Sequence, residues 1–339
     1  MKLVSFEVAT LLGPFTRLGA LWRHQVVDLN LAAAARFASL GQPEPRRLAD
    51  VLLPPDMLAF LDLGRDALAE ARHALSWAAA ETEKHGAPAG PRGERIVHDR
   101  SAVRLLAPLQ PRSLRDFFAY EDHALKAWAR AGSSLPSSWY EHPVYFKCNH
   151  REVYGPDEEV PWPSYTRRFD FEAEVACVVG RTGRGLSRLQ AHTHIAGFTI
   201  LDDFSARDVM KSELACGMGP AKGKDFAYGL GPCLVTTDEA GPEEDLEIQV
   251  RVNGELWSQG RTGDRYWSWG LLLSHVSQEE TLYPGDVLGS GTFFRGCGLD
   301  LERWVNPGDE VELRVDKLGS LRHRIGKPAS QTRLKYERG

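Results

Sequence analysis

Two glutamates in the stretch "RRFDFEAEVACVVG" have a spacing that could bind a cation. Glu172 and Glu174 lie two residues apart, and side chains two apart on a β-strand point to the same face. Two ionised carboxylates held side by side repel each other unless a cation, an arginine or a lysine neutralises them. The alternative is a strand that begins in solvent, so that only its other face is buried. The pair alone leaves both interpretations open.

Two further segments bring more acids and a histidine. The segment "TILDDFSARDVMK" is a hydrophobic strand that runs into Asp202 and Asp203, and functional groups often collect where a strand ends. The segment "SLRDFFAYEDHALKAWAR" separates Asp116 from His123 by seven residues, close to two turns of a helix predicted near 115–131. Asp116 could equally be an N-terminal helix carboxylate, and His123 a surface histidine. These residues alone do not decide between the two readings.

Other catalytic motifs are not supported by their spacing. The glycine-rich stretch "GMGPAKGKDFAYGLGP" resembles a phosphate-binding loop only superficially, because the gap from Gly219 to Lys224 is one residue short and Asp225 stands where Ser or Thr would meet magnesium. His192 and His194 follow a helical pattern, on which they would diverge instead of sharing a metal. The sequence contains no G-x-G-x-x-G after a strand and no G-x-S-x-G. Neither a Rossmann domain nor a nucleophile elbow is predicted.

The composition is that of a globular protein without an electrostatic attraction to polyanions. The chain has 339 residues, enough for about two domains, and a formal net charge of -5, which gives no reason to expect nucleic acid or an anionic membrane as a partner. No apolar run approaches the length of a signal peptide core or a membrane span, so a cytoplasmic location is expected. The five cysteines include no C-x-x-C pair and are predicted to be free, mostly buried thiols.

The pattern of elements predicts two domains. Residues 1–105 form a small N-terminal α/β domain, with short strands in "KLVSFEV", "RLGALWR" and "QVVDL" and a helix over about 66–85. Residues 106–339 are richer in strands, with a hairpin turn at Asn253-Gly254 and Pro-Gly-Asp turns that precede two further strands. Helices are expected near 187–195 and 267–277. The predicted class is α+β with a β-rich larger domain.

Six segments, taken in order, resemble successive motifs of the fumarylacetoacetate hydrolase family. They are "RDFFAYEDH", "FDFEAEVACVVG", "LDDFSARD", "GPAKGKDFAYGLGP", "PGDVLGSGT" and "GCGLDLERWVNPGD". The resemblance covers about residues 105–326, and the N-terminal region is only loosely similar. It implies a mixed β-sandwich or roll as the catalytic domain, a divalent cation, Mg²⁺ or Mn²⁺ with Ca²⁺ as a substitute, and a homodimer.

The resemblance also assigns roles to residues. It implies four metal ligands, Asp116, Glu172, Glu174 and Asp203, and an all-oxygen set of this kind suits a hard cation. His123 resembles the catalytic histidine, and Asp300 of "GLDL" stands where the family usually has Glu. Lys224 and Arg207 resemble residues that support the substrate oxygens, and Thr292 resembles a substrate contact. Asp170 has the same strand parity as the two glutamates, yet the family pattern gives it no ligand role.

Four positions depart from the family pattern in the expected substrate pocket. Phe118 and Phe146 stand where tyrosines are usual, Met210 replaces a glutamine, and Tyr228 replaces a threonine. One interpretation is neutral drift. The other is a substrate whose acyl portion is larger or less polar than that of fumarylacetoacetate, because a pocket without polar groups favours apolar ligand surface.

The first hypothesis for function is a metal-dependent hydrolase that cleaves a carbon–carbon bond in an acylpyruvate or another 1,3-dicarbonyl acid. The alternative is a decarboxylase, tautomerase or hydratase of a 2-oxo acid, since the same enolate chemistry serves these reactions. The pair of His123 and Asp300 favours hydrolysis, because activation of water is what such a pair would add. A catalytically silent protein on the same fold is a third possibility, against which the retained acids, His123 and Lys224 speak.

Overall fold

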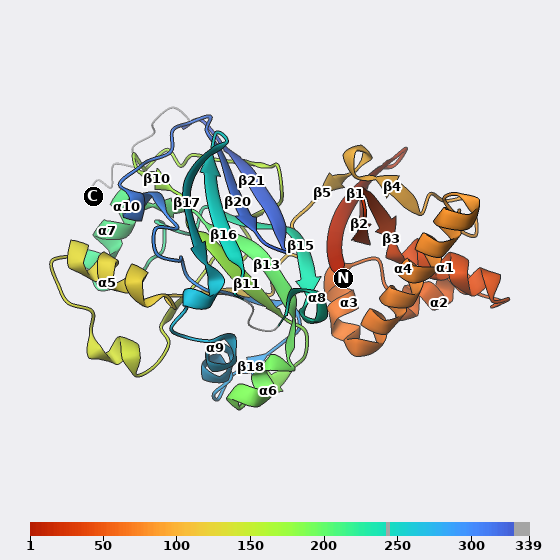
Figure 1. Cartoon of the computed structure of the whole chain (residues 1–339), viewed down its shortest axis with the longest axis horizontal. Coiled ribbons are helices and arrows are strands. Elements are labelled where there is room, and N and C mark those ends of the chain that lie inside the picture. Colours follow the sequence, from red (N-terminus) through yellow and green to blue (C-terminus); the bar gives the residue numbers. More distant parts are fainter. Residues whose placement is uncertain (242–244, 329–339) are drawn as a thin grey trace, which may run out of the picture.

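The structure is a computed structural model that describes residues 1–241 and 245–328. Its N-terminal region combines a small antiparallel sheet with four helices and lies at the right of Figure 1. Its elements are β1 (Lys2–Thr10), β2 (Gly13–Trp22), β3 (Gln25–Asp28), α1 (Leu29–Ser39), α2 (Pro45–Leu52), α3 (Met57–Leu63), α4 (Arg65–His85), β4 (Val97–Asp99) and β5 (Arg104–Leu105). The three predicted strands and the helix near 66–85 are confirmed. Helices α1–α3 were not predicted, and α1 is buried over almost its whole length, so it carries no amphipathic pattern.

A long mixed sheet crosses the molecule from this region into the rest of the chain. Its strands run in the order β4-β3-β2-β1-β15-β13-β11-β19-β6-β7, and β5 and β8 pair with β1 and β15. The strands not yet given are β6 (Ser113–Phe117), β7 (Tyr145–Lys147), β8 (Val153–Tyr154), β11 (Ala173–Val179), β13 (Ile195–Asp203), β15 (Tyr228–Thr236) and β19 (Asp286–Gly289). Strands β1 and β15, which connect the N-terminal region to the rest of the sheet, are antiparallel, with Lys2 opposite Val235 and Leu3 opposite Leu234.

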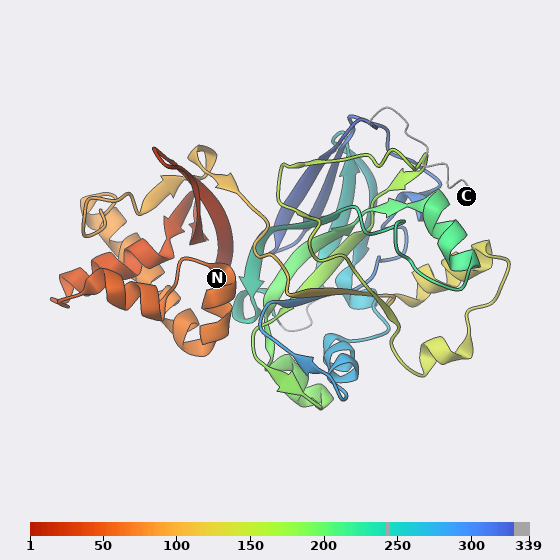
Figure 2. The ribbon, with the colours of Figure 1, turned by 180° about the vertical axis from the view of Figure 1, so that it is seen from behind.

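A second sheet packs on the long one and completes a β-sandwich, seen from both sides in Figures 1 and 2. Its order is β17-β16-β20-β21-β9, formed by β9 (Glu159–Val160), β16 (Glu247–Val252), β17 (Glu255–Arg261), β20 (Glu310–Val315) and β21 (Gly319–Ile325). Two short pairs flank the sandwich, β10 (Phe169–Asp170) with β14 (Ser205–Ala206) and β12 (Gly183–Arg184) with β18 (Thr281–Leu282). The remaining helices are α5 (Glu121–Arg130), α6 (Arg188–His192), α7 (Arg207–Ala215), α8 (Thr237–Ala240), α9 (Trp269–Val276) and α10 (Gly298–Leu301). The α+β, β-rich class is confirmed.

Strand β11 is buried on both faces, because each face packs against a different core. Val175 and Cys177 belong to the core between the two sheets. Ala176 and Val178 belong to a second core, which they share with helices α1–α4. A strand covered on both sides reads as a continuous apolar run, which explains "EVACVVG". Glu174 has the parity of Ala176 and therefore lies at the end of the face that carries the second core.

The predicted turns are found, and the backbone explains their residue types. Asn253 and Gly254 join β16 to β17 with φ angles of 51° and 79°, the left-handed pair that a tight hairpin requires. The two Pro-Gly-Asp turns precede β19 and β20 as expected, and their glycines also have positive φ. The helices predicted near 187–195 and 267–277 correspond to α6 and α9.

The helix predicted near 115–131 is wrong in its first part. Residues Ser113–Phe117 form strand β6, which runs parallel to β19, and the helix begins only at Glu121. Pairing with β19 buries Asp116 and Phe117 in the sheet, so tertiary contacts override the local helical pattern. Asp116 and His123 therefore do not share a helix face. They come from two different elements.

The two-domain division at residue 105 stays a prediction. Strand β1 hydrogen-bonds to β15, and the second core joins helices α1–α4 to β11, β13 and β15. The N-terminal region and the sandwich thus share a sheet and a hydrophobic core. Among the described residues, no helix is long and apolar enough to cross a membrane.

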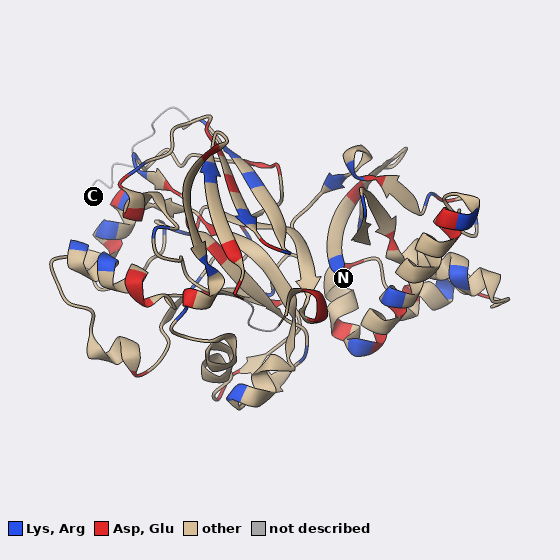
Figure 3. Cartoon of the chain, viewed as in Figure 1, with Lys and Arg blue, Asp and Glu red and all other residues tan. Residues whose placement is uncertain are grey.

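Side chains of both signs are interspersed over the two regions (Figure 3), and strand β21 carries Arg322, His323 and Arg324 in succession. Arg322 and Arg324 are exposed, whereas His323 between them is 1% exposed because strand residues alternate in direction. His323 donates from Nε2 to the Gly155 carbonyl oxygen at 3.1 Å. Burial lowers the pKa of His323 to about 4. The folded protein therefore holds this imidazole neutral at pH values where an unfolded chain would protonate it.

We predict that His323 makes the protein less stable in mild acid. Because its folded pKa lies below its unfolded pKa of about 6.5, the free energy of unfolding should fall by about 2 kcal/mol between pH 7 and pH 5 on account of this group alone. Chemical denaturation of wild type and His323→Gln at both pH values measures the difference. The exposed His24→Gln is the matched control, and an identical pH dependence in wild type and His323→Gln would contradict the assignment.

Candidate active site

Three carboxylates from three neighbouring strands meet at the end of the long sheet. Asp116 lies on β6, Glu174 on β11 and Asp203 at the last position of β13. One oxygen from each lies within 4.8 Å of the others, and all three side chains are at most 4% exposed. The strand order β13-β11-β19-β6 explains the convergence, because Asp116 and Glu174 flank the short strand β19.

Backbone groups after β19 hold two of these carboxylates. The Gly291 N–H donates to Asp116 Oδ1 at 3.2 Å and to Glu174 Oε2 at 3.0 Å, and the Thr292 hydroxyl donates to Glu174 Oε1 at 3.3 Å. A Cβ at Gly289 would lie 2.5 Å from Asp116 Oδ1, so glycine is needed there for the carboxylates to approach the strand.

The arrangement of oxygens fits a hard divalent cation. Burial raises the pKa values of Asp116, Glu174 and Asp203, and the neighbouring carboxylate Asp116 raises that of Glu174 further. Asp203 Oδ1 is buried and has no hydrogen-bond partner among the described residues. Three buried carboxylates with one unsatisfied oxygen form an all-oxygen donor set of the kind that Mg²⁺, Mn²⁺ or Ca²⁺ prefers.

Glu172 joins this cluster through a lysine. Its carboxylate accepts from Arg207 Nη2 at 2.8 Å and from Lys224 Nζ, which also donates to Asp203 Oδ2. Burial works to raise the Glu172 pKa, but Arg207 and Lys224 together lower it below its usual value. Glu172 is therefore an ionised partner of two cations, and Lys224 is the bridge between it and Asp203.

The strand that was expected to carry both glutamates is interrupted. Strand β10 ends at Asp170 and β11 begins at Ala173, and Glu172 between them makes only an isolated bridge with Cys297. The interpretation of a solvent-exposed entrance is wrong, since Glu172 is 6% exposed and Glu174 is 1% exposed. The carboxylates are buried because basic side chains and backbone N–H groups surround them.

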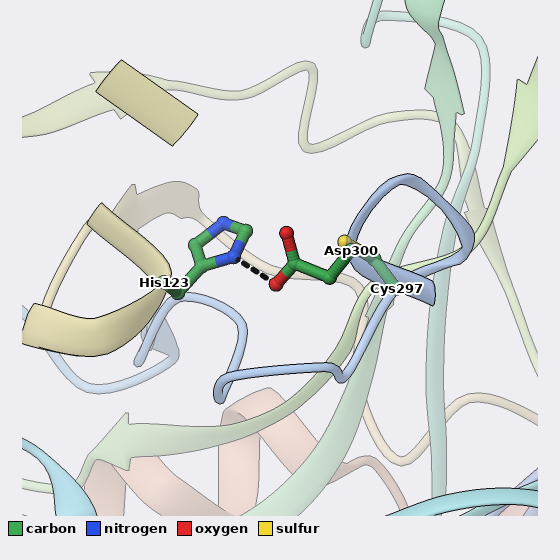
Figure 4. A group of neighbouring side chains, drawn as sticks. All are labelled: His123, Cys297 and Asp300. Carbon is green, nitrogen blue, oxygen red and sulfur yellow. Dashed lines mark hydrogen bonds and ion pairs between the residues drawn. The ribbon is translucent and has the colours of Figure 1, made fainter. Parts of the chain in front are cut away.

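A histidine–aspartate pair lies next to the cluster. His123 on α5 and Asp300 on α10 face each other, with 2.7 Å between Nδ1 and Oδ2 (Figure 4). Asp300 Oδ2 also accepts from the Arg295 N–H at 3.1 Å. The Phe118 ring packs edge-to-face against the imidazole, with the two ring centroids 5.2 Å apart. Glu172 forms a bridge with Cys297, three residues before Asp300, so the pair and the carboxylates are neighbours.

Asp170 connects the two halves of the site, a role that the sequence analysis missed. Its carboxylate accepts from Arg207 Nε at 2.7 Å and from the N–H groups of Gly298 and Leu299 at 2.8 and 2.9 Å. Gly298 and Leu299 open helix α10, which carries Asp300. A buried carboxylate on the first N–H groups of α10 thus fixes Asp300 relative to Arg207. The sequence signal that could have revealed this role is the two-residue spacing of Asp170 from Glu172, which on a strand puts both side chains on the same face.

The predicted substrate-binding residues separate into three groups. Phe118, Phe146 and Met210 are half-buried around the charged residues, and the Phe146 ring centroid lies 5.7 Å from Lys224 Nζ. Tyr228 is fully buried in the second core, against which Phe146 also packs, and it lies opposite Asp203 in the pairing of β13 with β15. The Thr292 hydroxyl donates a hydrogen bond to Glu174, as described above. The five cysteines are free, and all but Cys216 are buried, as predicted.

Comparison with known proteins identifies the family. The family model described as "Fumarylacetoacetate (FAA) hydrolase C-terminal" matches residues 113–326, more than half of the chain. The chain therefore belongs to the fumarylacetoacetate hydrolase family.

Individual relatives carry the names of different reactions. The oxaloacetate tautomerase YisK of Bacillus subtilis (strain 168) is 29% identical over 91% of this chain and 98% of its own. The 2,4-didehydro-3-deoxy-L-rhamnonate hydrolase of Sphingomonas sp. (strain SKA58) is 34% identical over 61% of this chain and 70% of its own. The solved fumarylacetoacetate hydrolase of Exiguobacterium antarcticum shares the fold, with a TM-score of 0.66, 24% identity and coverage of 96% of this chain and 99% of that one. The comparisons thus show an enzyme family and leave the reaction to be argued.

We predict that Glu174 and Asp170 differ in their effect on metal binding. Glu174→Gln removes a carboxylate from the three-oxygen group, so binding of Mn²⁺ should weaken more than about 10-fold. Asp170→Asn leaves that group intact and should bind Mn²⁺ nearly as wild type does. Titration calorimetry with Mn²⁺ on both variants checks this, and equal affinities in the two would contradict the proposed ligand set.

Proposed function

We propose that the protein is a divalent-metal-dependent hydrolase that cleaves a carbon–carbon bond in an acylpyruvate or another 1,3-dicarbonyl acid. The observation that carries the proposal is the buried His123–Asp300 pair beside an all-oxygen carboxylate cluster. Asp116, Glu174 and Asp203, with Glu172 next to them, would hold Mg²⁺ or Mn²⁺. The bound cation would polarise the substrate's carbonyl oxygens and stabilise negative charge on them.

The pair supplies the base. Asp300 accepts a hydrogen bond from Nδ1 of His123, which leaves Nε2 free of its proton and able to take one from water. The hydroxide adds to the distal carbonyl carbon, the bond between that carbon and the central carbon breaks, and the proton held by His123 goes to the central carbon. One water is consumed, and the products are a carboxylic acid and a 2-oxo acid.

Arg207 and Lys224 adjust the charge of the site. Both are buried, and both contact Glu172, so they neutralise a carboxylate that would otherwise repel an anionic substrate. Burial works to lower the Lys224 pKa, but Asp203 and Glu172 raise it above its usual value, so the ammonium stays charged. Positive charge fixed in a water-poor site supports negative charge that develops on substrate oxygens.

A second candidate is an oxaloacetate tautomerase, favoured by the match to YisK over nearly the full length of both chains. The same His123 could remove a proton from carbon 3 of a 2-oxo acid and return it to the carbonyl oxygen. The two reactions share every residue named above and differ in whether water enters the product. A decarboxylase or hydratase would use the same enolate chemistry. In each case the partner is a small 2-oxo or 1,3-dicarbonyl acid, and the homodimer stays a prediction.

We expect product analysis to decide between the two. The Mg²⁺-loaded protein is incubated with a panel of acylpyruvates and with oxaloacetate, and products are identified chemically, because loss of enol absorbance accompanies both reactions. Release of pyruvate and a carboxylic acid supports hydrolysis. Conversion of enol to keto oxaloacetate with no acylpyruvate cleaved would replace the first proposal with the second.

The His123–Asp300 pair should be needed for hydrolysis in a way that metal binding is not. His123→Gln and Asp300→Asn should each lower kcat for acylpyruvate cleavage by about 10²–10⁴-fold, because the base or its orientation is lost. Binding of Mn²⁺ should change little in either variant. Wild-type kcat in both variants would show that the pair is not the base.

The pocket residues predict a preference for apolar acyl groups. Phe118, Phe146 and Met210 offer no hydrogen bond to a substrate carboxylate, so an acylpyruvate with an apolar acyl chain should have a higher kcat/KM than fumarylacetoacetate. Phe118→Tyr restores the polar group and should narrow the difference, with Leu125→Met, an exposed position on α5, as control. A kcat/KM for fumarylacetoacetate equal to or above that for the apolar substrates would contradict the apolar preference and favour neutral drift at these positions.

A further inference from the structure

A second group of potential metal ligands lies beside the carboxylate cluster and has a different chemistry. His123, Cys297 and Asp300 each offer one ligand atom, and these atoms lie within 4.8 Å of one another (Figure 4). Their exposed fractions are 4%, 0% and 8%. The carboxylate cluster contains oxygen donors only, whereas this group combines an imidazole nitrogen, a thiol sulfur and a carboxylate oxygen. Nitrogen and sulfur donors select Zn²⁺ over Mg²⁺ or Mn²⁺.

The fold positions the three ligands before any metal arrives. Cys297 precedes α10 and Asp300 lies in its first turn, three residues later, so both side chains lie on one side of the helix. Asp170 fixes this turn by accepting the Gly298 and Leu299 N–H groups. Arg130, at the end of the helix that carries His123, donates to the Leu299 carbonyl and ties α5 to α10.

One oxygen of the group has no hydrogen bond to satisfy it. Asp300 Oδ2 is used by His123 and the Arg295 N–H, but Asp300 Oδ1 is buried without a hydrogen-bond partner among the described residues. Arg130 Nη1 lies 3.8 Å away, within reach of its charge but beyond hydrogen-bond distance. A buried, unsatisfied carboxylate oxygen beside a thiol and an imidazole is the feature that points to a ligand.

We infer that His123, Cys297 and Asp300 form a Zn²⁺ site whose occupation blocks turnover. On binding, Zn²⁺ displaces the proton of the Cys297 thiol, which leaves to solvent, and His123 binds through Nδ1 as a neutral imidazole whose proton moves from Nδ1 to Nε2. One thiolate and one carboxylate balance the charge of the ion, and a fourth position remains for water. The inhibitory consequence rests on the proposed function, because the imidazole that Zn²⁺ holds is then no longer the base for water.

The binding claim is tested with Co²⁺, which replaces Zn²⁺ at such sites and reports thiolate ligation by a charge-transfer absorption in the near ultraviolet. The full-length protein is titrated with Co²⁺ in excess Mg²⁺, which occupies the oxygen cluster. Wild type should show the thiolate band at a stoichiometry of one, and added Zn²⁺ should abolish it. Cys297→Ser should show no band, and His123→Gln should need at least about 10-fold more Co²⁺.

Cys148→Ser is the matched control, because Cys148 is also buried and lies near Asp203 and Asp116 of the other cluster. This variant should keep the wild-type band. Absence of the band in wild type, or a band that persists in Cys297→Ser and disappears in Cys148→Ser, overturns the zinc site. Retention of the far-ultraviolet circular dichroism spectrum in each variant excludes unfolding as the cause.

Inhibition is measured separately, so that failure of the zinc site and failure of the proposed function remain distinct. Zn²⁺ at one equivalent should abolish most of whatever turnover the substrate panel reveals, and the inhibitory concentration should rise at least about 10-fold in Cys297→Ser. A cobalt band without any acylpyruvate cleavage leaves the site in place and removes only the hydrolase. Equal zinc sensitivity of wild type and Cys297→Ser contradicts the inhibitory role.

Discussion

The arrangement of the site depends on the burial of several acidic side chains around Lys224 and Arg207. The acids buried there are Asp116, Asp170, Glu172, Glu174, Asp202 and Asp203. Isolated buried charges cost several kcal/mol each, so such a group persists only where cations and N–H donors compensate it. Arg207 pairs with Asp170 and Glu172, and Lys224 pairs with Glu172 and Asp203. The pKa of Glu172 falls below its usual value, whereas burial keeps the pKa values of Asp116, Asp170, Glu174 and Asp203 raised. A divalent cation bound there would supply the positive charge that these residues lack.

The β-sandwich makes this concentration of charge possible. Strands β11 and β13 are covered on both faces by apolar cores, and their ends deliver Glu174 and Asp203 to one point. Glycine at 289 leaves room for the Asp116 and Glu174 carboxylates, and glycine at 291 lets its backbone approach that of Phe117 and Ala119. Asp170 then extends the same network to α10, so the position of Asp300 depends on a carboxylate that touches neither His123 nor the three-oxygen group.

Much of the architecture was predictable, and the failures have physical reasons. The hairpin at Asn253-Gly254 and the Pro-Gly-Asp turns depend on local backbone preferences, which the sequence displays directly. Helix α1 and strand β6 were missed or mistaken, because burial on all sides erases periodicity and pairing with β19 is a long-range contact. The acids of the site were found by spacing and by family resemblance. The interruption of the strand at Glu172, the roles of Asp170 and Arg130, and the proximity of Cys297 to His123 arise from tertiary contacts that no short motif encodes.

The central claim is that Asp116, Glu174 and Asp203 surround one cation, and anomalous diffraction tests it most directly. A crystal grown with Mn²⁺ and measured at two wavelengths, above and below the manganese absorption edge, locates the metal without reference to activity. The account predicts a single strong anomalous peak among the oxygens of these three residues, within coordination distance of Asp203 Oδ1. A peak elsewhere, or none at full Mn²⁺ loading with Lys224 still bridging Glu172 and Asp203, would contradict it.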